Sequence, residues 1–187
     1  ETEKITTGQK LDLTIKTEIK IVGEDETSCN RGAEYVIEFY SEIKGNYLRN
    51  IGYMGEQIDL WLTSRNMGSL WYGVGTPDEE KTSDGLSFII MMAVAKMPSE
   101  SFRKDMFKAK RKSLDEIWSG DLIPSADIVR FAPSACNLQP WKVESSNGEI
   151  KVYRYKKPGK RGTMPVKKVR YYNMIDMGIF IFFLETC

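Results

Sequence analysis

The sequence predicts an α+β fold in which helices flank a mainly antiparallel sheet. Asn147-Gly148 separates two strand-like segments, which is a strong hairpin signal. The other strand-like and helix-like segments follow one another without the regular alternation that is typical of a parallel sheet. With 187 residues and 41% hydrophobic content, the chain can bury a core of ordinary size.

Two strands are expected before the first helix. Between Leu11 and Ile21 most odd positions are apolar and most even positions are polar, which predicts a half-buried strand. Residues 35–40 are the second strand candidate. From Asn46 onward the pattern becomes helical, and its apolar face consists of Met54, Ile58, Trp61 and Leu62.

The first helix is expected to end between Asn66 and Gly68, where Gly68 is available for a left-handed residue. Gly52 and Gly55 are expected to let another backbone approach the start of this helix. Residues 70–74 then form a short extended exit. The continuous apolar run 88–95 suits a central strand.

The second half of the chain continues the mixture of element types. We expect short helical pieces at 114–118 and 126–132, strands at 141–145 and 149–155, and a strongly apolar helix at 173–185. The hairpin and the absence of βαβ order both favour a mainly antiparallel sheet.

Composition excludes several kinds of chemistry. The 27 basic and 26 acidic side chains give a net charge of +1, which argues against nucleic-acid or membrane-surface binding by the molecule as a whole. The chain has no histidine, so Ser-His-Asp catalysis and histidine-based zinc sites are excluded, and we expect no metal site. Chemistry carried by a cofactor is the remaining interpretation.

The cysteine spacing indicates where in the cell the protein resides, and the length of the apolar runs indicates whether it spans a membrane. The three cysteines have no C-x-x-C spacing, which fits a reducing environment, so the cytoplasm is the expected location. The apolar runs are too short to span a bilayer. Because the chain starts at Glu1 without a methionine and stops at Cys187 after an apolar run, we expect both termini to be incomplete.

The segment from Ala132 to Trp141 is the most informative part of the sequence. Prolines at 133 and 140 restrict the backbone on either side, so a fixed loop is expected to present hydroxyl and amide groups. These groups belong to Ser134, Asn137 and Gln139. Fixed donors and acceptors suit a planar heterocycle, whereas the plain alternative is a helix-to-strand connection with turn-forming polar residues.

This loop resembles the P-S-x-x-N-x-Q-P-W motif of the FMN-dependent nitroreductase family. The resemblance implies a nitroreductase-like fold in which Ser134, Asn137 and Gln139 hydrogen-bond the polar edge of the flavin. A second segment is similar to the L-G-[ST]-x-W-x-G exit of the family's central helix, which lines the N5 side of the flavin. It contains Gly68, Ser69, Leu70, Trp71, Tyr72 and Gly73. A capped helix that leads into a buried strand is the alternative for this segment.

A basic segment stands where family members neutralise the FMN phosphate. It contains Lys110, Arg111 and Lys112. A phosphate monoester carries nearly two negative charges at neutral pH, and lysine and arginine are its usual partners. A solvated basic face is the alternative interpretation.

The order of the motifs departs from the usual family pattern. The exit segment precedes the 132–141 loop, and the arginine-rich R-R-S-x-R-x-[FY] helix that usually begins these proteins is missing. The order resembles a subgroup in which one chain imitates the two-subunit flavin site. We therefore expect a single domain, 1–187, built from two pseudo-repeated halves at about 1–118 and 119–187. Such a chain is expected to be a monomer or a homodimer.

The resemblance implies that FMN is held between the two motif segments. FMN would accept a hydride at N5 from NADH or NADPH and reduce a small-molecule electron acceptor such as a nitroaromatic compound or a quinone, with no catalytic side chain. A non-enzymatic flavin-binding or interaction protein is the first alternative. The basic segment 151–170 with its nearby tyrosines suggests a nucleic-acid binder, but no recognised nucleic-acid motif accompanies it, so a solvated hairpin and loop is the favoured interpretation.

Overall fold

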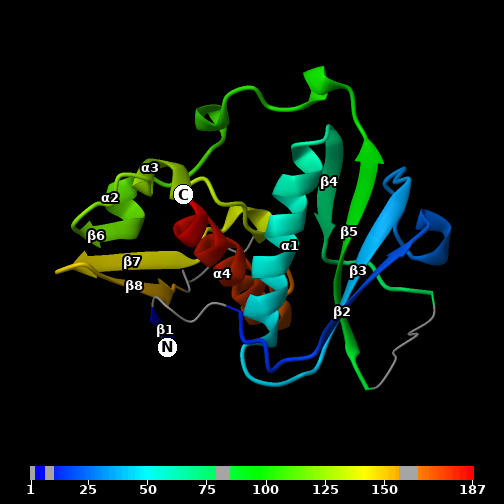
Figure 1. The fold of residues 1–187 in the computed structure, drawn as a ribbon, viewed down its shortest axis with the longest axis horizontal. Helices are drawn as coiled ribbons and strands as arrows, with labels where there is room; N and C mark the ends of the chain where they lie inside the picture. Colours follow the sequence, from blue (N-terminus) through cyan, green and yellow to red (C-terminus); the bar gives the residue numbers. More distant parts are fainter. Residues whose placement is uncertain (1–2, 7–10, 79–84, 156–163) are drawn as a thin grey trace. The chain divides into compact units, whose positions relative to one another are not determined.

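The structure is a computed structural model that describes residues 3–6, 11–78, 85–155 and 164–187. Its strands are β1 (Glu3–Thr6), β2 (Thr17–Val22), β3 (Tyr35–Ser41), β4 (Met67–Tyr72), β5 (Ser87–Lys96), β6 (Trp118–Gly120), β7 (Trp141–Ser146) and β8 (Glu149–Arg154). Its α-helices are α1 (Tyr47–Thr63), α2 (Leu114–Ile117), α3 (Ala126–Val129) and α4 (Val169–Thr186) (Figure 1). Its 3₁₀ helices are η1 (Glu24–Glu26), η2 (Ser99–Ser101), η3 (Met106–Lys108), η4 (Ala135–Asn137) and η5 (Val166–Lys168).

The chain divides into two compact units. The first unit comprises Glu1–Asp12, Leu48–Met54 and Asp105–Cys187, and the second comprises Leu13–Tyr47 and Gly55–Lys104. Each contains a four-stranded sheet, with the order β1-β8-β7-β6 in the first and β2-β3-β5-β4 in the second. The predicted pseudo-repeated halves concern a duplication of the sequence and stay a prediction.

The sheet of the first unit is built around the predicted hairpin. β7 and β8 pair antiparallel with Ser146 opposite Glu149, and both turn residues, Asn147 and Gly148, have positive φ. Two consecutive left-handed residues are what a tight hairpin turn requires, which explains the Asn-Gly pair. β6 joins β7 in parallel and β1 joins β8 antiparallel. β1 was not expected from the sequence pattern.

Two glycines bring α4 and the first turns of α1 into contact within the first unit. A Cβ at Gly52 would overlap the carbonyl oxygen of Ile175, and a Cβ at Gly178 would overlap that of Arg49. The two helix backbones therefore touch where neither has a side chain. This confirms that Gly52 admits another backbone, whereas Gly55 instead accommodates the ring of Trp71 in the second unit.

The sheet of the second unit has β5 and β3 at its centre. The apolar run of β5 is buried over most of its length, which confirms the predicted central strand. On one face of the sheet Val36, Met91 and Ala93 pack with Cys29 in a buried cluster. On the opposite face Phe39 and Trp71 stack at 5.9 Å between ring centroids.

The prediction of a half-buried strand at 11–21 was only partly correct. β2 begins at Thr17, and Ile19 and Ile21, which the alternation predicted to be buried, are exposed. β2 is an edge strand, so its side chains have a neighbouring strand on one side only.

Two expectations for α1 were wrong. Trp61 is exposed rather than part of the buried face, and Arg65 lies over its ring at 4.0 Å. The left-handed residue after the helix is Asn66, with φ of 57°, whereas Gly68 lies inside β4. Asparagine tolerates this conformation because its short polar side chain can bond locally.

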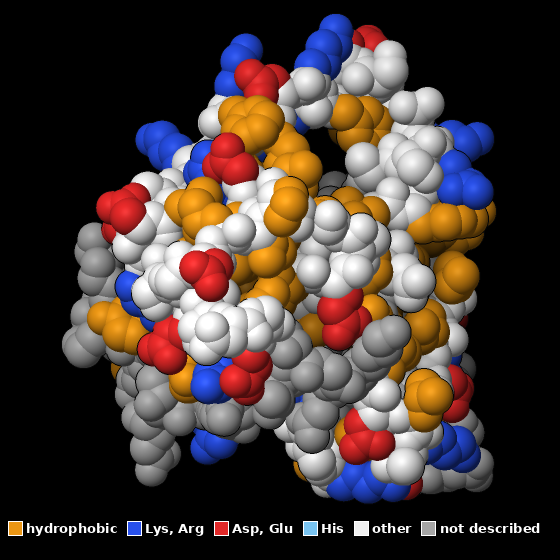
Figure 2. Space-filling view, turned by 60° about the vertical axis from the view of Figure 1, so that its left-hand side comes forward, with side chains coloured by type: hydrophobic (Ala, Val, Ile, Leu, Met, Phe, Trp, Pro, Cys, Tyr) orange, Lys and Arg blue, Asp and Glu red, His pale blue; other side chains and the backbone are white. Residues whose placement is uncertain are grey.

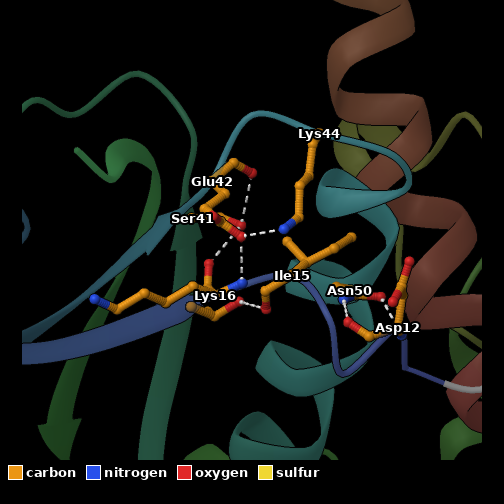
Figure 3. A network of polar contacts seen from close by, with 8 residues as sticks. Asp12, Ile15, Lys16, Ser41, Glu42, Lys44 and Asn50 are labelled. Carbon is orange, nitrogen blue, oxygen red and sulfur yellow. Dashed lines mark hydrogen bonds and ion pairs between the residues drawn. The ribbon is translucent and has the colours of Figure 1, made fainter. Parts of the chain in front are cut away.

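The entry to β2 is held by a small polar network in the second unit (Figure 3). The Glu42 carboxylate accepts the backbone N–H of Lys16 at 2.8 Å and pairs with the Lys44 ammonium at 2.8 Å. The Glu42 backbone N–H in turn donates to the carbonyl oxygen of Lys16 at 3.0 Å. These contacts fix the phase of hydrogen bonding between β2 and β3.

The face drawn in Figure 2 carries basic and acidic side chains interspersed with hydrophobic ones. This distribution agrees with the net charge of +1. No helix in the described part of the chain has the length and apolar character needed to cross a membrane.

Candidate functional site

The 132–141 loop of the first unit has an unusual backbone. Ser134 is extended, and the residues that follow form η4. Cys136, Asn137 and Gln139 all have positive φ, between 47° and 53°. Each such residue costs on the order of 1 kcal/mol, so the surrounding contacts must hold this conformation in place.

Gln139 is the central side chain of the loop and is only 4% exposed. Its Oε1 accepts the backbone N–H of Lys112 at 2.7 Å, and its Nε2 donates to the carbonyl oxygen of Asn137 at 3.2 Å. Its own backbone N–H donates to the hydroxyl oxygen of Ser134 at 2.9 Å. Gln139 thus ties the loop to itself and to the basic segment 110–112.

Asn137 makes the second link to the basic segment. Its Oδ1 accepts a hydrogen bond from Nη1 of Arg111 at 3.0 Å, and its Nδ2 donates to the carbonyl oxygen of Lys110 at 3.0 Å. Both polar atoms of this amide are therefore engaged within the protein.

The side chain of Lys112 makes the third link between the basic segment and the loop. Its Nζ donates to the carbonyl oxygens of Leu138 and Gln139, at 3.1 and 2.7 Å. The named acceptors of Arg111 and Lys112 are neutral oxygens, and these hydrogen bonds fix the position of both side chains. Lys110 keeps an exposed side chain.

The structure thus brings together six of the predicted site residues. They come from two segments that lie more than twenty positions apart in the sequence. They are Lys110, Arg111, Lys112, Ser134, Asn137 and Gln139. A donor set of one guanidinium and two ammonium groups fits a phosphate monoester. The amides of Asn137 and Gln139 face the protein, so their first role is to position the loop and the basic segment.

A buried aspartate in α4 holds the 132–141 loop through a hydrogen bond to its backbone. Asp176 is 2% exposed, and its Oδ1 accepts the backbone N–H of Ala135 at 2.8 Å. Asn173, one turn earlier, donates to Oδ2 at 3.3 Å. Burial raises the pKa of Asp176 to about 7, although both hydrogen bonds favour the charged form.

The predicted exit segment forms β4 in the second unit, where alternate side chains face α1. The hydroxyl of Ser69 donates to the carboxylate of Asp59, and the ring of Trp71 lies against Gly55. A Cβ at Gly68 would meet the side chain of Met97. Leu70 is exposed, whereas Tyr72 and Gly73 are half-buried.

Two acidic side chains of α1 lie behind β4, and of these Glu56 is buried and Asp59 is half-buried. Burial, and to a smaller extent the nearby Asp59, raises the pKa of Glu56 to about 8. Burial likewise raises the pKa of Asp59, opposed by the hydrogen bond from Ser69. The indole nitrogen of Trp71 is buried without a hydrogen bond of ordinary geometry to any described residue, yet it lies near enough to lower both pKa values slightly.

The two motif segments belong to different units. The 134–139 loop with residues 110–112 is part of the first unit, and residues 68–73 are part of the second. A flavin clamp formed by both segments stays a prediction. The basic segment 151–170 is described only in part, because residues 156–163 lie outside the described residues.

Asp176 and Glu56 were not among the site residues predicted from the sequence. A signal existed for each, because Asp176 interrupts a strongly apolar helix and Glu56 lies beside a glycine on the packed side of α1. An isolated acid in such a place is either paired or has a shifted pKa. In the described residues no group of three His, Cys, Asp or Glu side chains is arranged to hold a metal ion.

Comparisons with known proteins agree with this fold. A family model described as Putative TM nitroreductase matches residues 1–186. The crystal structure of a putative nitroreductase from Thermotoga maritima matches with a TM-score of 0.58 and 22% sequence identity over 90% of this chain. The match covers 64% of that longer chain, and at this identity it shows the α+β fold alone. No curated protein matches.

Proposed function

Since the chain belongs to the family described as Putative TM nitroreductase, we propose that it is an FMN-dependent oxidoreductase. It uses NADH or NADPH to reduce a small-molecule acceptor such as a nitroaromatic compound or a quinone. Bound FMN supplies the redox chemistry at N5, which needs no histidine and no protein nucleophile. The cytoplasm is the proposed location.

The observation that supports this proposal most is the contact between the 134–139 loop and residues 110–112. Hydrogen bonds from both amides of the loop hold a basic segment whose charges suit a phosphate group. In the proposed site Lys110, Arg111 and Lys112 bind the FMN phosphate, and the Ser134 hydroxyl bonds the flavin. Asn137 and Gln139 keep these groups in position. Residues 68–73 are proposed to line the N5 side.

Paired measurements of FMN and riboflavin affinity test the proposed phosphate site. Both ligands are titrated by quenching of flavin fluorescence, and riboflavin differs by lacking the phosphate. Lys110→Ala removes an exposed charge without disturbing the hydrogen bonds of its backbone. It is expected to weaken FMN binding about tenfold and to leave riboflavin binding unchanged, because one charge-assisted contact is worth about 1.5 kcal/mol.

Lys104→Ala is the matched control, because Lys104 is also an exposed lysine but lies outside the predicted segment. It should leave both affinities unchanged. Equal losses of FMN affinity in the two variants would mean that general charge, rather than the 110–112 segment, attracts the ligand. Protein that binds neither ligand would contradict the proposed cofactor.

Activity is tested separately. Loss of flavin absorbance after anaerobic addition of NADH or NADPH, and its return with a nitroaromatic compound or a quinone, is the expected result. If FMN binds but is reduced no faster than free FMN, the chain is a non-enzymatic flavin-binding protein, and the proposed oxidoreductase activity is wrong.

A further inference from the structure

The outer strand of the second sheet presents an open backbone edge. β2 is the first strand in the order β2-β3-β5-β4, and no described strand pairs with its other side. The Glu42 N–H donates to the Lys16 carbonyl, so residue pair 16 and 42 is hydrogen-bonded. Because antiparallel pairs alternate, the backbone groups of Thr17, Ile19 and Ile21 point away from β3.

Two of these residues, Ile19 and Ile21, also expose apolar side chains to solvent. Ile19 is 41% exposed and Ile21 is 68% exposed, although their partners in β3, Phe39 and Ile37, are buried. Natural proteins usually protect an edge strand with charges, proline or a bulge. β2 contains no proline, and its two charged residues, Glu18 and Lys20, have opposite signs, so they do not prevent two copies of this edge from pairing.

The charges of β2 select a particular partner and register. Glu18 and Lys20 flank Ile19 on the other face of the strand, with 3.5 Å between Lys20 Nζ and Glu18 Oε1. In an antiparallel pair of two β2 strands centred on Ile19, Glu18 lies opposite the partner's Lys20, and Lys20 lies opposite the partner's Glu18. A pair centred on Lys20 would place two ammonium groups opposite each other, which is unfavourable.

Hydrogen bonding agrees with this register. Ile19 has outward backbone groups, so it exchanges two hydrogen bonds with Ile19 of the partner subunit. The charged pairs then fall at the non-hydrogen-bonded positions, where side chains approach most closely. We propose that β2 is a self-association edge, at which a second copy of this chain pairs antiparallel about Ile19 and joins two four-stranded sheets across a two-fold axis.

This interface is short, so the dimer is expected to be reversible and dependent on concentration. Part of its stability comes from ion pairs between partly exposed side chains, which salt screens. The test is sedimentation velocity of the purified protein over a concentration series at low and high salt. Dimer that increases with concentration and decreases with salt is expected, and a monomer at every concentration would overturn the proposal.

Charge exchange tests the register. Glu18→Lys and Lys20→Glu each place like charges opposite one another, and each is expected to raise the dimer dissociation constant about tenfold or more. The double variant Glu18→Lys/Lys20→Glu restores opposite charges and should dimerise like the original chain. An equimolar mixture of the two single variants should form a mixed dimer for the same reason.

Far-UV circular dichroism confirms that each variant is folded. The mixture and the double variant separate a lost interface from a damaged β2, because damage to the strand would not be repaired by a second charge change. Dimerisation that is unchanged in both single variants, or a mixture that stays monomeric, would overturn the proposed pairing.

Discussion

Asp176 shows how one residue can join a binding loop to the core. Its carboxylate holds the Ala135 N–H next to a run of left-handed residues, and it does so from inside an apolar helix. A neutral carboxylic acid still accepts this hydrogen bond, whereas a buried charge is costly. The stability of the protein should therefore depend on the protonation of this group.

The first prediction concerns Asp176→Asn. The pKa of Asp176 in the folded state is about 7, raised from 3.8, so the folded protein binds more protons than the unfolded chain between these values. Through this group, the free energy of unfolding falls as pH rises from about 4 to 7, by on the order of 4 kcal/mol. The asparagine keeps an acceptor oxygen and cannot ionise, so it should remove this decrease.

Urea unfolding at several pH values from 4 to 8 measures the effect. The variant is expected to be more stable than the original protein above pH 7 and similar to it near pH 4. Asp115→Asn, at an exposed position, is the control and should preserve the pH dependence of the original protein. Parallel curves for Asp176→Asn and the original chain would contradict the prediction.

At the scale of elements, glycine determines how α1 and α4 pack in the first unit. Helix propensity disfavours glycine by about 1 kcal/mol relative to alanine, so its presence in the middle of two helices needs a reason. The reason is the direct contact of backbones at Gly52 and Gly178.

The second prediction follows from this contact. Gly52→Ala and Gly178→Ala are each expected to destabilise the protein by more than about 2 kcal/mol, because overlap with a carbonyl oxygen exceeds the gain in helix propensity. Gln57→Ala, at an exposed position of α1, should be nearly neutral. Thermal unfolding of the three variants provides the comparison, and stabilisation by either glycine substitution would show that the helices separate easily.

The elements also show how much of the architecture was predictable. The hairpin, the central strand β5 and the helices followed from turn chemistry and local periodicity. The prediction that Ile19 and Ile21 are buried was wrong. Both residues have the alternation of a half-buried strand, but they lie in a strand at the edge of the sheet. Periodicity identifies the two faces of a strand but does not say which face is covered.

At the scale of the whole molecule, α1 belongs to both units. Residues 48–54 contribute to the first unit and the rest of the helix to the second, within one continuous run of backbone hydrogen bonds. Unfolding one unit would break this helix in its middle, which removes several hydrogen bonds at once.

The third prediction is therefore a single cooperative transition. Tryptophan fluorescence reports on both units, because Trp61 and Trp71 belong to the second unit and Trp118 and Trp141 to the first. Urea curves from fluorescence and from far-UV circular dichroism should coincide. Two separated transitions would show that the units fold independently despite the shared helix.

The candidate site shows most clearly which features follow from short segments of sequence and which depend on tertiary contacts. Turn chemistry and the resemblance to the family's motifs, which are both read from short segments of sequence, were enough to select the 134–139 loop and residues 110–112. Only the tertiary structure decided that Asn137 and Gln139 hold the basic segment and that Asp176 supports the loop. Contacts and burial depend on which distant segments meet, and no local pattern contains that information.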